Sequence, residues 1–227
     1  MTMATPHGIF SFDPVSLLGV ELCNHGEVEP GMRRNMERAL RPGATFVDLG
    51  ANEGYFTVIG ARLVGPTGRV LAIEPQQRLL PILHDNIARN GLCNVTVRDV
   101  AIGMSESTQR LYLSADTNTG GSGLSRSGRL PLATQPVQVQ RLQEVLSAQG
   151  IDRVDFMKID IEGSEYEAVL ASPEVFRQQR VDVLGMELHP TVLASCGKDA
   201  ADIIKFLADC GYRMSEIEGH TVWTVEP

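Results

Sequence analysis

The sequence predicts an α/β domain built on a largely parallel β-sheet with helices on both faces. Three observations support this fold class. Strand-like and helix-like segments alternate along most of the 227 residues, a length that suits one large domain. A glycine-rich turn follows the first strand of this alternation, and acidic residues stand where several strands end. In such folds ligands bind at the carboxyl ends of the strands, so these strand ends form the candidate site.

Turn residues delimit the first half of the alternation. Pro42-Gly43 ends the first expected helix, and a turn over 65–68 separates the second helix from the next strand. Pro81 falls near the first turn of an expected helix, where proline is tolerated. The expected elements are a helix at 31–40, a buried strand at 45–50, a helix at 54–64, a strand at 69–74, a helix at 77–90 and a strand at 94–102.

Residues 109–140 interrupt the alternation. Residues 110–113 and 137–140 are typical of strands, and a segment rich in Gly, Ser and Thr joins them. We therefore expect a hairpin-like insertion. Its loop, 114–135, is either a plain flexible linker or a lid that becomes ordered over a ligand.

The alternation then resumes with a helix at 141–150, a strand at 154–161, a helix at 164–170, a strand at 181–189 and a helix at 199–211. Two strands at 212–217 and 220–225 flank the turn Glu218-Gly219, which predicts an antiparallel hairpin and a mixed sheet. We expect residues 31–227 to form the domain and residues 1–30 to form an N-terminal segment that packs on it.

Composition narrows the classes of function. The formal net charge of −8 has the wrong sign for holding a phosphate backbone, and aromatic residues, at 5%, are too sparse for a large base-stacking surface. We therefore expect no nucleic-acid partner. The densest basic cluster has helical spacing and is expected to form a solvated helix face: Arg33, Arg34, Arg38 and Arg41.

The chain shows no segment typical of a signal peptide or a membrane helix, so we expect no membrane partner. The four cysteines are isolated, and their spacing fits no zinc site, which predicts reduced thiols. Together these features favour a cytoplasmic protein. A homodimer that packs through the N-terminal segment is a further expectation.

The first strand runs into FVDLGANEGYF (46–56), in which Gly50 and Gly54 allow a tight turn and a close approach to a ligand. Asn52 stands where a dinucleotide-binding turn has its middle glycine, which favours a ligand without a phosphate at this point. Glu74 ends the second strand, 20 residues beyond Gly54, where an acid can bind both ribose hydroxyls. The alternative for Glu74 is a surface acid before a turn.

Five segments resemble the FkbM-type methyltransferases: GEVEPGM (26–32), FVDLGANEGYF (46–56), VLAIEP (70–75), VAIG (100–103) and MKIDIEGSE (157–165). Members of this family use S-adenosyl-L-methionine and mostly methylate hydroxyl groups on sugars, polyketides and related secondary metabolites. The resemblance extends from about residue 26 to 190. It implies a Rossmann-like class I methyltransferase fold, with a seven-stranded, mostly parallel sheet that has one antiparallel strand.

The resemblance also implies roles for the strand ends. Glu74 would bind the ribose of the cofactor, and Asp99 and Val100 would lie near its adenine. The residues implied on the methionine and ribose side of the cofactor are Asp48, Gly50, Asn52, Gly54 and Tyr55.

MKIDIEGSEYE (157–167) holds four acids at the end of an apolar strand. Ser164 and Glu167 have the spacing of a capping box, and Glu165 would then lie in the first turn of a helix, where an acid is favoured. Asp160 remains as the acid at the carboxyl edge of a central strand, where it can contact both substrates, and Glu162 lies ambiguously at the turn.

Glu187 and His189 share one side of the next strand, which the implied strand order places beside the strand that ends at Asp160. We expect these three residues to face one pocket. His189 is the first candidate for a catalytic base and Asp160 the second, while the same set could bind Mg²⁺ or Mn²⁺. The alternative is that Lys158 pairs with one of the acids and that His189 only begins a loop.

The predicted function is S-adenosylmethionine-dependent O-methylation of a small molecule, most of all a sugar or a glycosylated or polyketide secondary metabolite. Residues 160–163 follow the fourth strand without the Pro-Pro-Tyr turn of amino-directed enzymes. A peptide or lipid-linked acceptor remains an alternative. Further alternatives are a nicotinamide-dependent oxidoreductase and a non-catalytic nucleoside-binding module. Residues that bind the acceptor are expected in the N-terminal segment, in the 114–135 loop and after His189.

Overall fold

The computed structural model describes residues 1–125 and 133–225. Its main sheet consists of β3 (Thr45–Leu49), β4 (Arg69–Ile73), β5 (Val95–Arg98), β9 (Val154–Ile159), β10 (Val181–Met186), β11 (Tyr212–Ile217) and β12 (His220–Val225). The seven strands lie in the order β11-β12-β10-β9-β3-β4-β5. β12 is antiparallel to both of its neighbours, and the other neighbouring pairs are parallel. The predicted mixed sheet with one antiparallel strand is therefore confirmed.

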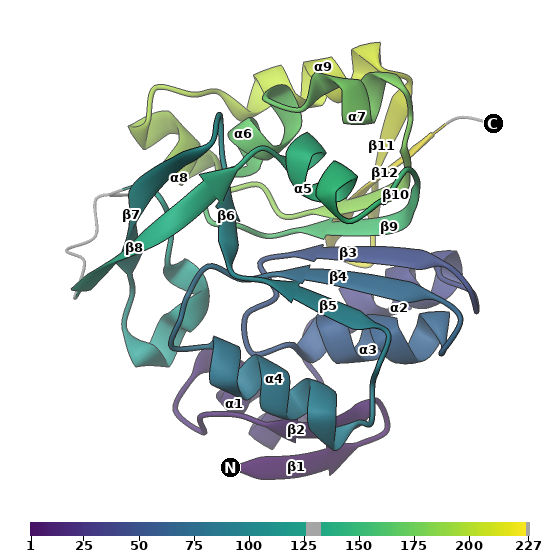
Figure 1. The fold of residues 1–227 in the computed structure, drawn as a ribbon, viewed down its shortest axis with the longest axis vertical. Helices are drawn as coiled ribbons and strands as arrows, with labels where there is room; N and C mark the ends of the chain where they lie inside the picture. Colours follow the sequence, from purple (N-terminus) through teal and green to yellow (C-terminus); the bar gives the residue numbers. More distant parts are fainter. Residues whose placement is uncertain (126–132, 226–227) are drawn as a thin grey trace.

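Helices cover both faces of this sheet, and Figure 1 shows α5, α6, α7 and α9 on one side with α3 and α4 on the other. The helices are α1 (Leu17–His25), α2 (Pro30–Ala39), α3 (Tyr55–Val64), α4 (Leu80–Arg89), α5 (Leu142–Ala148), α6 (Glu165–Leu170), α7 (Pro173–Arg177), α8 (Pro190–Ser195) and α9 (Ala200–Asp209). The sequence did not predict α1, α7 or α8.

The side chains of β9 alternate between the two faces, as expected for a strand. Met157 and Ile159 are buried in the core that includes α5, α6, α7 and α9. Phe156 is buried in the core formed with α2 and α3. The alternation places Lys158 on the same side as Phe156, where it lies over the ring of Phe56.

The strand predicted at 94–102 is wrong as a single element. The strand is interrupted at Asp99. The residues that follow, β6 (Val100–Ile102), belong to a second sheet of order β6-β8-β7. There β7 (Ser107–Leu113) and β8 (Ala133–Gln140) pair antiparallel, which confirms the predicted hairpin. The 3₁₀ helix η1 (Asp116–Gly121) begins its loop, and residues 126–132 of the expected lid lie outside the described part.

The N-terminal hairpin of β1 (Thr2–Thr5) and β2 (Gly8–Ser11) packs beside α4 (Figure 1). The side chain of Asn86 on α4 binds the backbone of Ser11, and that of Asn90, which follows this helix, binds the backbone of Ile9. Phe10 and Phe12 are buried in the same core as α2 and α3. This segment therefore contributes to the hydrophobic core of its own chain.

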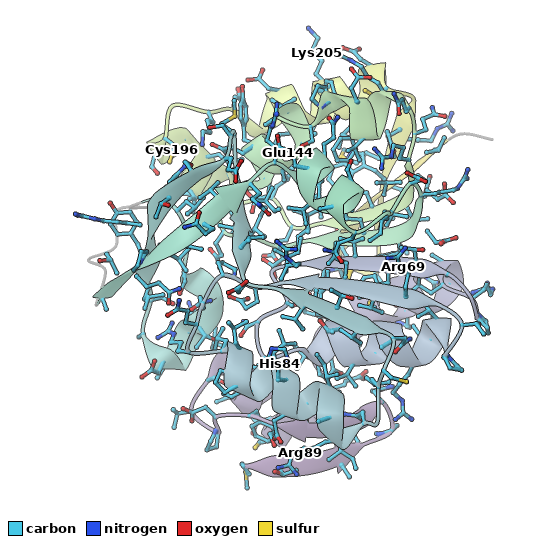
Figure 2. All side chains as sticks on the ribbon, viewed as in Figure 1. Arg69, His84, Arg89, Glu144, Cys196 and Lys205 are labelled. Atoms are coloured by element: carbon cyan, nitrogen blue, oxygen red, sulfur yellow. The ribbon has the colours of Figure 1, made fainter. Side chains whose placement is uncertain are left out.

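The surface is consistent with the composition. Within the described residues, no helix is long and apolar enough to cross a membrane. All four cysteines are unpaired. Arg33, Arg34 and Arg38 form ion pairs with glutamates. Figure 2 shows other basic side chains far apart on the outside of the molecule, namely Arg69, Arg89 and Lys205.

Candidate active site

The turn after β3 brings the end of this strand very close to the end of β9. Gly50 has φ 85°, and a Cβ on it would lie 1.9 Å from the carbonyl oxygen of Asp160. No other residue can occupy this position without moving one of the two strand ends. Asn52 and Gly54 also have positive φ, and Gly54 precedes the first turn of α3. The sequence FVDLGANEG therefore forms the close turn that was predicted from its glycines.

Lys158 and two acids form a buried charged row beneath this turn. Asp48 on β3 lies opposite Lys158 on β9, and the Lys158 ammonium lies 3.1 Å from Asp160 Oδ2. Burial raises the pKa of Asp48, against the charge of Lys158 and a hydrogen bond from Thr57. Burial would lower the pKa of Lys158, but the charges of Asp160 and Asp48 raise it. Lys158 is therefore a cation paired with an acid, which confirms the alternative in which Lys158 pairs with one of the acids of this region.

A cavity of about 50 Å³ opens above the ends of β3 and β4. Its polar wall includes Glu74, which is 2% exposed and accepts hydrogen bonds from the backbone N–H groups of Asn52 and Gln76, each at 2.8 Å. Burial raises the pKa of Glu74 to about 7, against these two hydrogen bonds. A buried carboxylate without a cationic partner is costly, and hydroxyl groups of a ligand would complete its hydrogen bonds.

The opposite wall of this cavity is apolar. It includes Val100, Ile102 and Leu111, which come from the β6-β8-β7 sheet. A flat apolar group fits against this wall, and a diol fits against Glu74. Asp99, predicted beside Val100, is exposed and does not line the cavity. The cavity therefore combines an apolar wall with a buried carboxylate, and at this break between strands Val100 rather than Asp99 lines it.

A second cavity, of about 350 Å³, continues from the first. The two share wall residues at the turn after β3, in η1 and after β9: Gly50, Asn52, Gly120, Asp160 and Glu162. The larger cavity is closed by α1, by the segment between α1 and α2 and by η1, which the Thr119 hydroxyl links to Asn52 at 3.2 Å. Its outer walls thus come from the N-terminal segment, the predicted loop and the residues around His189.

His189 lies among four carboxylates at the junction of the cavities. Its Nδ1 is 2.9 Å from Glu165, and its Nε2 is 3.7 to 3.9 Å from single oxygens of Asp160, Glu162 and Glu187. Burial alone would lower the pKa of His189, but the hydrogen bond with Glu165 and the surrounding charges raise it to about 9. The imidazole is therefore protonated at neutral pH in the protein without ligands.

The structure brings most of the predicted site residues together. The set Asp160, Glu187 and His189 faces one pocket, because each offers a ligand atom and these atoms lie within 4.8 Å of one another. Asp48 and Gly54 are buried without lining either cavity. The predicted site residues that line a cavity are Gly50, Asn52, Tyr55, Glu74, Val100, Asp160, Glu187 and His189.

The predicted capping box at 164–167 is wrong. Ser164 makes no side-chain cap, and Glu167 forms an ion pair with Lys198 instead. Glu165 is fully buried, accepts a hydrogen bond from the backbone N–H of Gly163 at 3.0 Å and contacts His189. The predicted helix start is confirmed, since Ser164 precedes α6 and both Glu165 and Glu167 lie in its first turn, but the side chains of these acids make tertiary contacts instead of a capping box.

Glu165 and Glu29 are the site residues that sequence reasoning missed. Glu29 lines the larger cavity, and burial raises its pKa to about 7, against the charge of Lys158. Both acids lie inside segments that carry the family resemblance, GEVEPGM and MKIDIEGSE. Their place in those segments was the signal that could have identified them.

Comparison with known proteins gives a family. The pattern of the methyltransferase FkbM domain matches residues 48–214. The chain is 27% identical over 187 residues to the AMB antimetabolite synthetase AmbE of Pseudomonas aeruginosa, and the match covers 66% of this chain and 8% of that protein. It is 28% identical over 153 residues to the methyltransferase sdnD of Sordaria araneosa, and this match covers 55% of this chain and 58% of that protein. The chain thus spans less than two thirds of either relative.

The fold also has known relatives. An rRNA methylase from Streptococcus thermophilus matches with a TM-score of 0.52 at 10% identity, over 88% of this chain and 98% of that one. At this identity the likeness shows the fold alone, which is that of the class I methyltransferases. The family match favours methyl transfer over nicotinamide-dependent oxidation on the same kind of sheet. The chain belongs to the FkbM methyltransferase family.

Proposed function

We propose that the protein transfers a methyl group to a hydroxyl of a small molecule, and that this acceptor is a sugar or a glycosylated or polyketide secondary metabolite. The observation that supports this most is the junction of the two cavities. The smaller cavity, which has Glu74 on its polar wall, meets the larger cavity at Asp160, which lines both, and further acids surround that point.

S-adenosylmethionine would bind with its nucleoside at the smaller cavity and its methionine part toward the junction. Glu74 would hold the ribose hydroxyls, Val100 would pack against the adenine, and Asn52 and Tyr55 would lie toward the methionine part. When bound, the cofactor supplies a methyl group on a positively charged sulfonium. The Gly50 turn fixes the distance between the cofactor wall and Asp160, because the two backbones are in contact there.

The difficult partner in this reaction is the acceptor, because an alcohol has a pKa far above 7 and must lose its proton. Asp160 is placed to accept this proton, because it lies at the boundary where both substrates meet. Lys158 binds Asp160 Oδ2, and Asp160 Oδ1 is directed to the side of His189. Glu187 lies next to the same point and is the second carboxylate that can take the proton.

The walls of the larger cavity support an acceptor with polar and apolar parts. Leu17 and Leu18 of α1, with Val28 and Phe56, form an apolar side. The acids around His189 form a polar end that can bind several hydroxyl groups of a sugar. The name of the relative AmbE, an antimetabolite synthetase, supports a role in natural-product biosynthesis.

The test uses pairs of acceptors that differ in one group. Sugars and glycosylated polyketides are incubated with methyl-labelled S-adenosylmethionine, each beside the analogue that carries an amine in place of the hydroxyl. The expected product is an O-methyl ether, located by mass-spectrometric fragmentation. Transfer to the amine or to carbon with no O-methyl product would contradict the proposal. Peptide and lipid-linked sugar acceptors form a further arm, and transfer confined to that arm would replace the proposed acceptor class.

A further inference from the structure

Three side chains at the junction of the cavities converge on one point. The ring atom His189 Nε2 lies 3.9 Å from Asp160 Oδ1 and 3.8 Å from Glu187 Oε1. Ligand atoms around a six-coordinate Mg²⁺ or Mn²⁺ are about 3 Å apart when adjacent and about 4 Å apart when opposite, given metal–oxygen distances near 2.1 Å. The observed separations lie between these two values, so a shift of a few tenths of an ångström in the side chains would bring the three atoms around one cation.

A fourth residue orients the histidine. Glu165 is 0% exposed, and its Oε1 lies 2.9 Å from His189 Nδ1 and accepts a hydrogen bond from Gly163. When Nδ1 carries the proton toward Glu165, Nε2 of the neutral ring is left with its lone pair directed at Asp160 and Glu187. Histidines that bind metals almost always donate their other N–H to a carboxylate or a carbonyl in this way.

The second oxygen of Glu165 gives an independent observation. Glu165 Oε2 is buried and has no hydrogen-bond partner among the described residues. A buried carboxylate with an unsatisfied oxygen is costly unless positive charge lies close to it. The other oxygen of the same carboxylate contacts His189 Nδ1 at 2.9 Å, so positive charge on the imidazole or on a cation bound to it would stabilise Glu165.

The balance of charges at the junction also favours a bound cation. Asp160, Glu162, Glu165 and Glu187 surround His189, and Glu29 lines the same cavity. Among the described residues that line this cavity, the basic side chains are Lys158, which lies between Asp48 and Asp160, and His189 itself. Carboxylates outnumber cations, so a divalent cation would reduce the repulsion among them.

We propose that Asp160, Glu187 and Nε2 of His189 bind one divalent cation, Mg²⁺ or Mn²⁺, and that Glu165 acts as the positioning residue for His189. This inference rests on the proposed function, because the cation would bind the acceptor hydroxyl at an open coordination position. It would lower the pKa of that hydroxyl and hold its oxygen near the donor. Carboxylate ligands suit both of these metals, and the imidazole is compatible with Mn²⁺.

The direct test is Mn²⁺ binding to the full-length chain after treatment with a chelator. The loss of the free Mn²⁺ signal in electron paramagnetic resonance is expected to show one saturable site that Mg²⁺ displaces. Asp160→Asn and Glu187→Gln should abolish this site. Glu165→Gln should weaken it by about 10- to 100-fold, the usual effect of losing an orienting carboxylate. Glu106→Gln, at an exposed acid that lines neither cavity, should leave it unchanged.

Each variant is also tested for binding of S-adenosylhomocysteine, so that a misfolded protein is recognised. Folded wild-type protein that binds no Mn²⁺ at millimolar concentration would overturn the inference, as would binding that Asp160→Asn and Glu187→Gln leave intact. Methylation of a hydroxyl at full rate in a chelator would overturn the metal site while the proposed function stands. A saturable Mn²⁺ site in an enzyme that methylates only amines or carbon would support the metal site and overturn the proposed function.

Discussion

Glu74 is the residue on which the proposed cofactor site depends most. It is buried, and the hydrogen bonds it accepts from Asn52 and Gln76 do not fully offset the cost, since its pKa rises to about 7. Each carboxylate oxygen has a second lone pair that a ribose hydroxyl can use. Ligand binding therefore favours the ionised form of Glu74.

The affinity for S-adenosylhomocysteine should consequently depend on pH. Below pH 7 the free protein holds a proton on Glu74 that the complex must release, so affinity should fall by up to about tenfold per pH unit. Above pH 7 the carboxylate is already ionised, and affinity should level off. Calorimetry from pH 5.5 to 8, in buffers of different ionisation enthalpy, measures both the affinity and the proton release.

Glu74→Gln is the matched variant for this prediction. It should weaken binding by about 1–3 kcal/mol, or roughly 5- to 150-fold, because one acceptor oxygen becomes a donor. It should also remove the pH dependence. A wild-type affinity that is constant between pH 5.5 and 8 would show that Glu74 does not contact the ligand.

The remaining site residues show what a sequence can predict at this scale. Asp160, Glu187 and His189 could be expected in one pocket because strand periodicity and neighbouring strand ends are simple geometric rules. The role of Glu165 could not be predicted in this way, because only the fold brings it to His189, which lies 24 residues away in the sequence. Local rules favoured a helix cap there, and a tertiary contact was stronger.

At the scale of elements, the contact between the ends of β3 and β9 determines the shape of the site. Gly50→Ala should destabilise the protein by about 3 kcal/mol or more, because the new Cβ overlaps the Asp160 carbonyl and the backbone has positive φ. Gly91→Ala is the matched control, since Gly91 has φ 61° and no atom within 4 Å of the new Cβ. It should cost about 1 kcal/mol. Urea unfolding of both variants measures the difference.

Equal destabilisation by the two substitutions would contradict this account of the turn. It would mean that the backbone conformation alone, and not the approach of the strand ends, makes glycine necessary at position 50.

The helix α1 should select the acceptor. Leu17 is 57% exposed and lines the larger cavity, so Leu17→Ser should raise the KM for an acceptor with an apolar part and leave the binding of S-adenosylhomocysteine unchanged. Val20, on the same helix, is 40% exposed and does not line this cavity, so Val20→Ser serves as control. Steady-state kinetics with an acceptor identified in the paired panel measures both. An unchanged KM in Leu17→Ser would remove α1 from the acceptor site.

Elements differed in how well the sequence predicted them. The alternating strands and helices of the main sheet were predicted because their apolar patterns are regular and glycine or proline marks their ends. α7 and α8 have only 5 and 6 residues, too few for a helical period to show. The break at Asp99 was missed because 94–102 keeps a strand-like pattern while the chain passes from one sheet to the other.

At the scale of the whole molecule, the strand order explains why two cavities meet where they do. β3 and β9 are neighbours at the centre of the sheet, with β4 on one side and β10 on the other. The ends of β3 and β4 form part of the wall of the smaller cavity, and the residues after β9 and β10 form the acid-rich junction. Alternation predicted a parallel sheet, but the order of its strands came from the family resemblance, because periodicity does not specify which strands are neighbours.

The central claim is that methyl transfer to a hydroxyl takes place beside Asp160. The most direct measurement is a single turnover of enzyme with ¹³C-methyl S-adenosylmethionine and an acceptor from the panel, for the wild type and for Asp160→Asn. The account predicts an O-methyl carbon resonance with the wild type. It predicts that Asp160→Asn keeps cofactor binding but slows transfer by about 100-fold or more. A product resonance of an N- or C-methyl group, or undiminished transfer by Asp160→Asn, would contradict it.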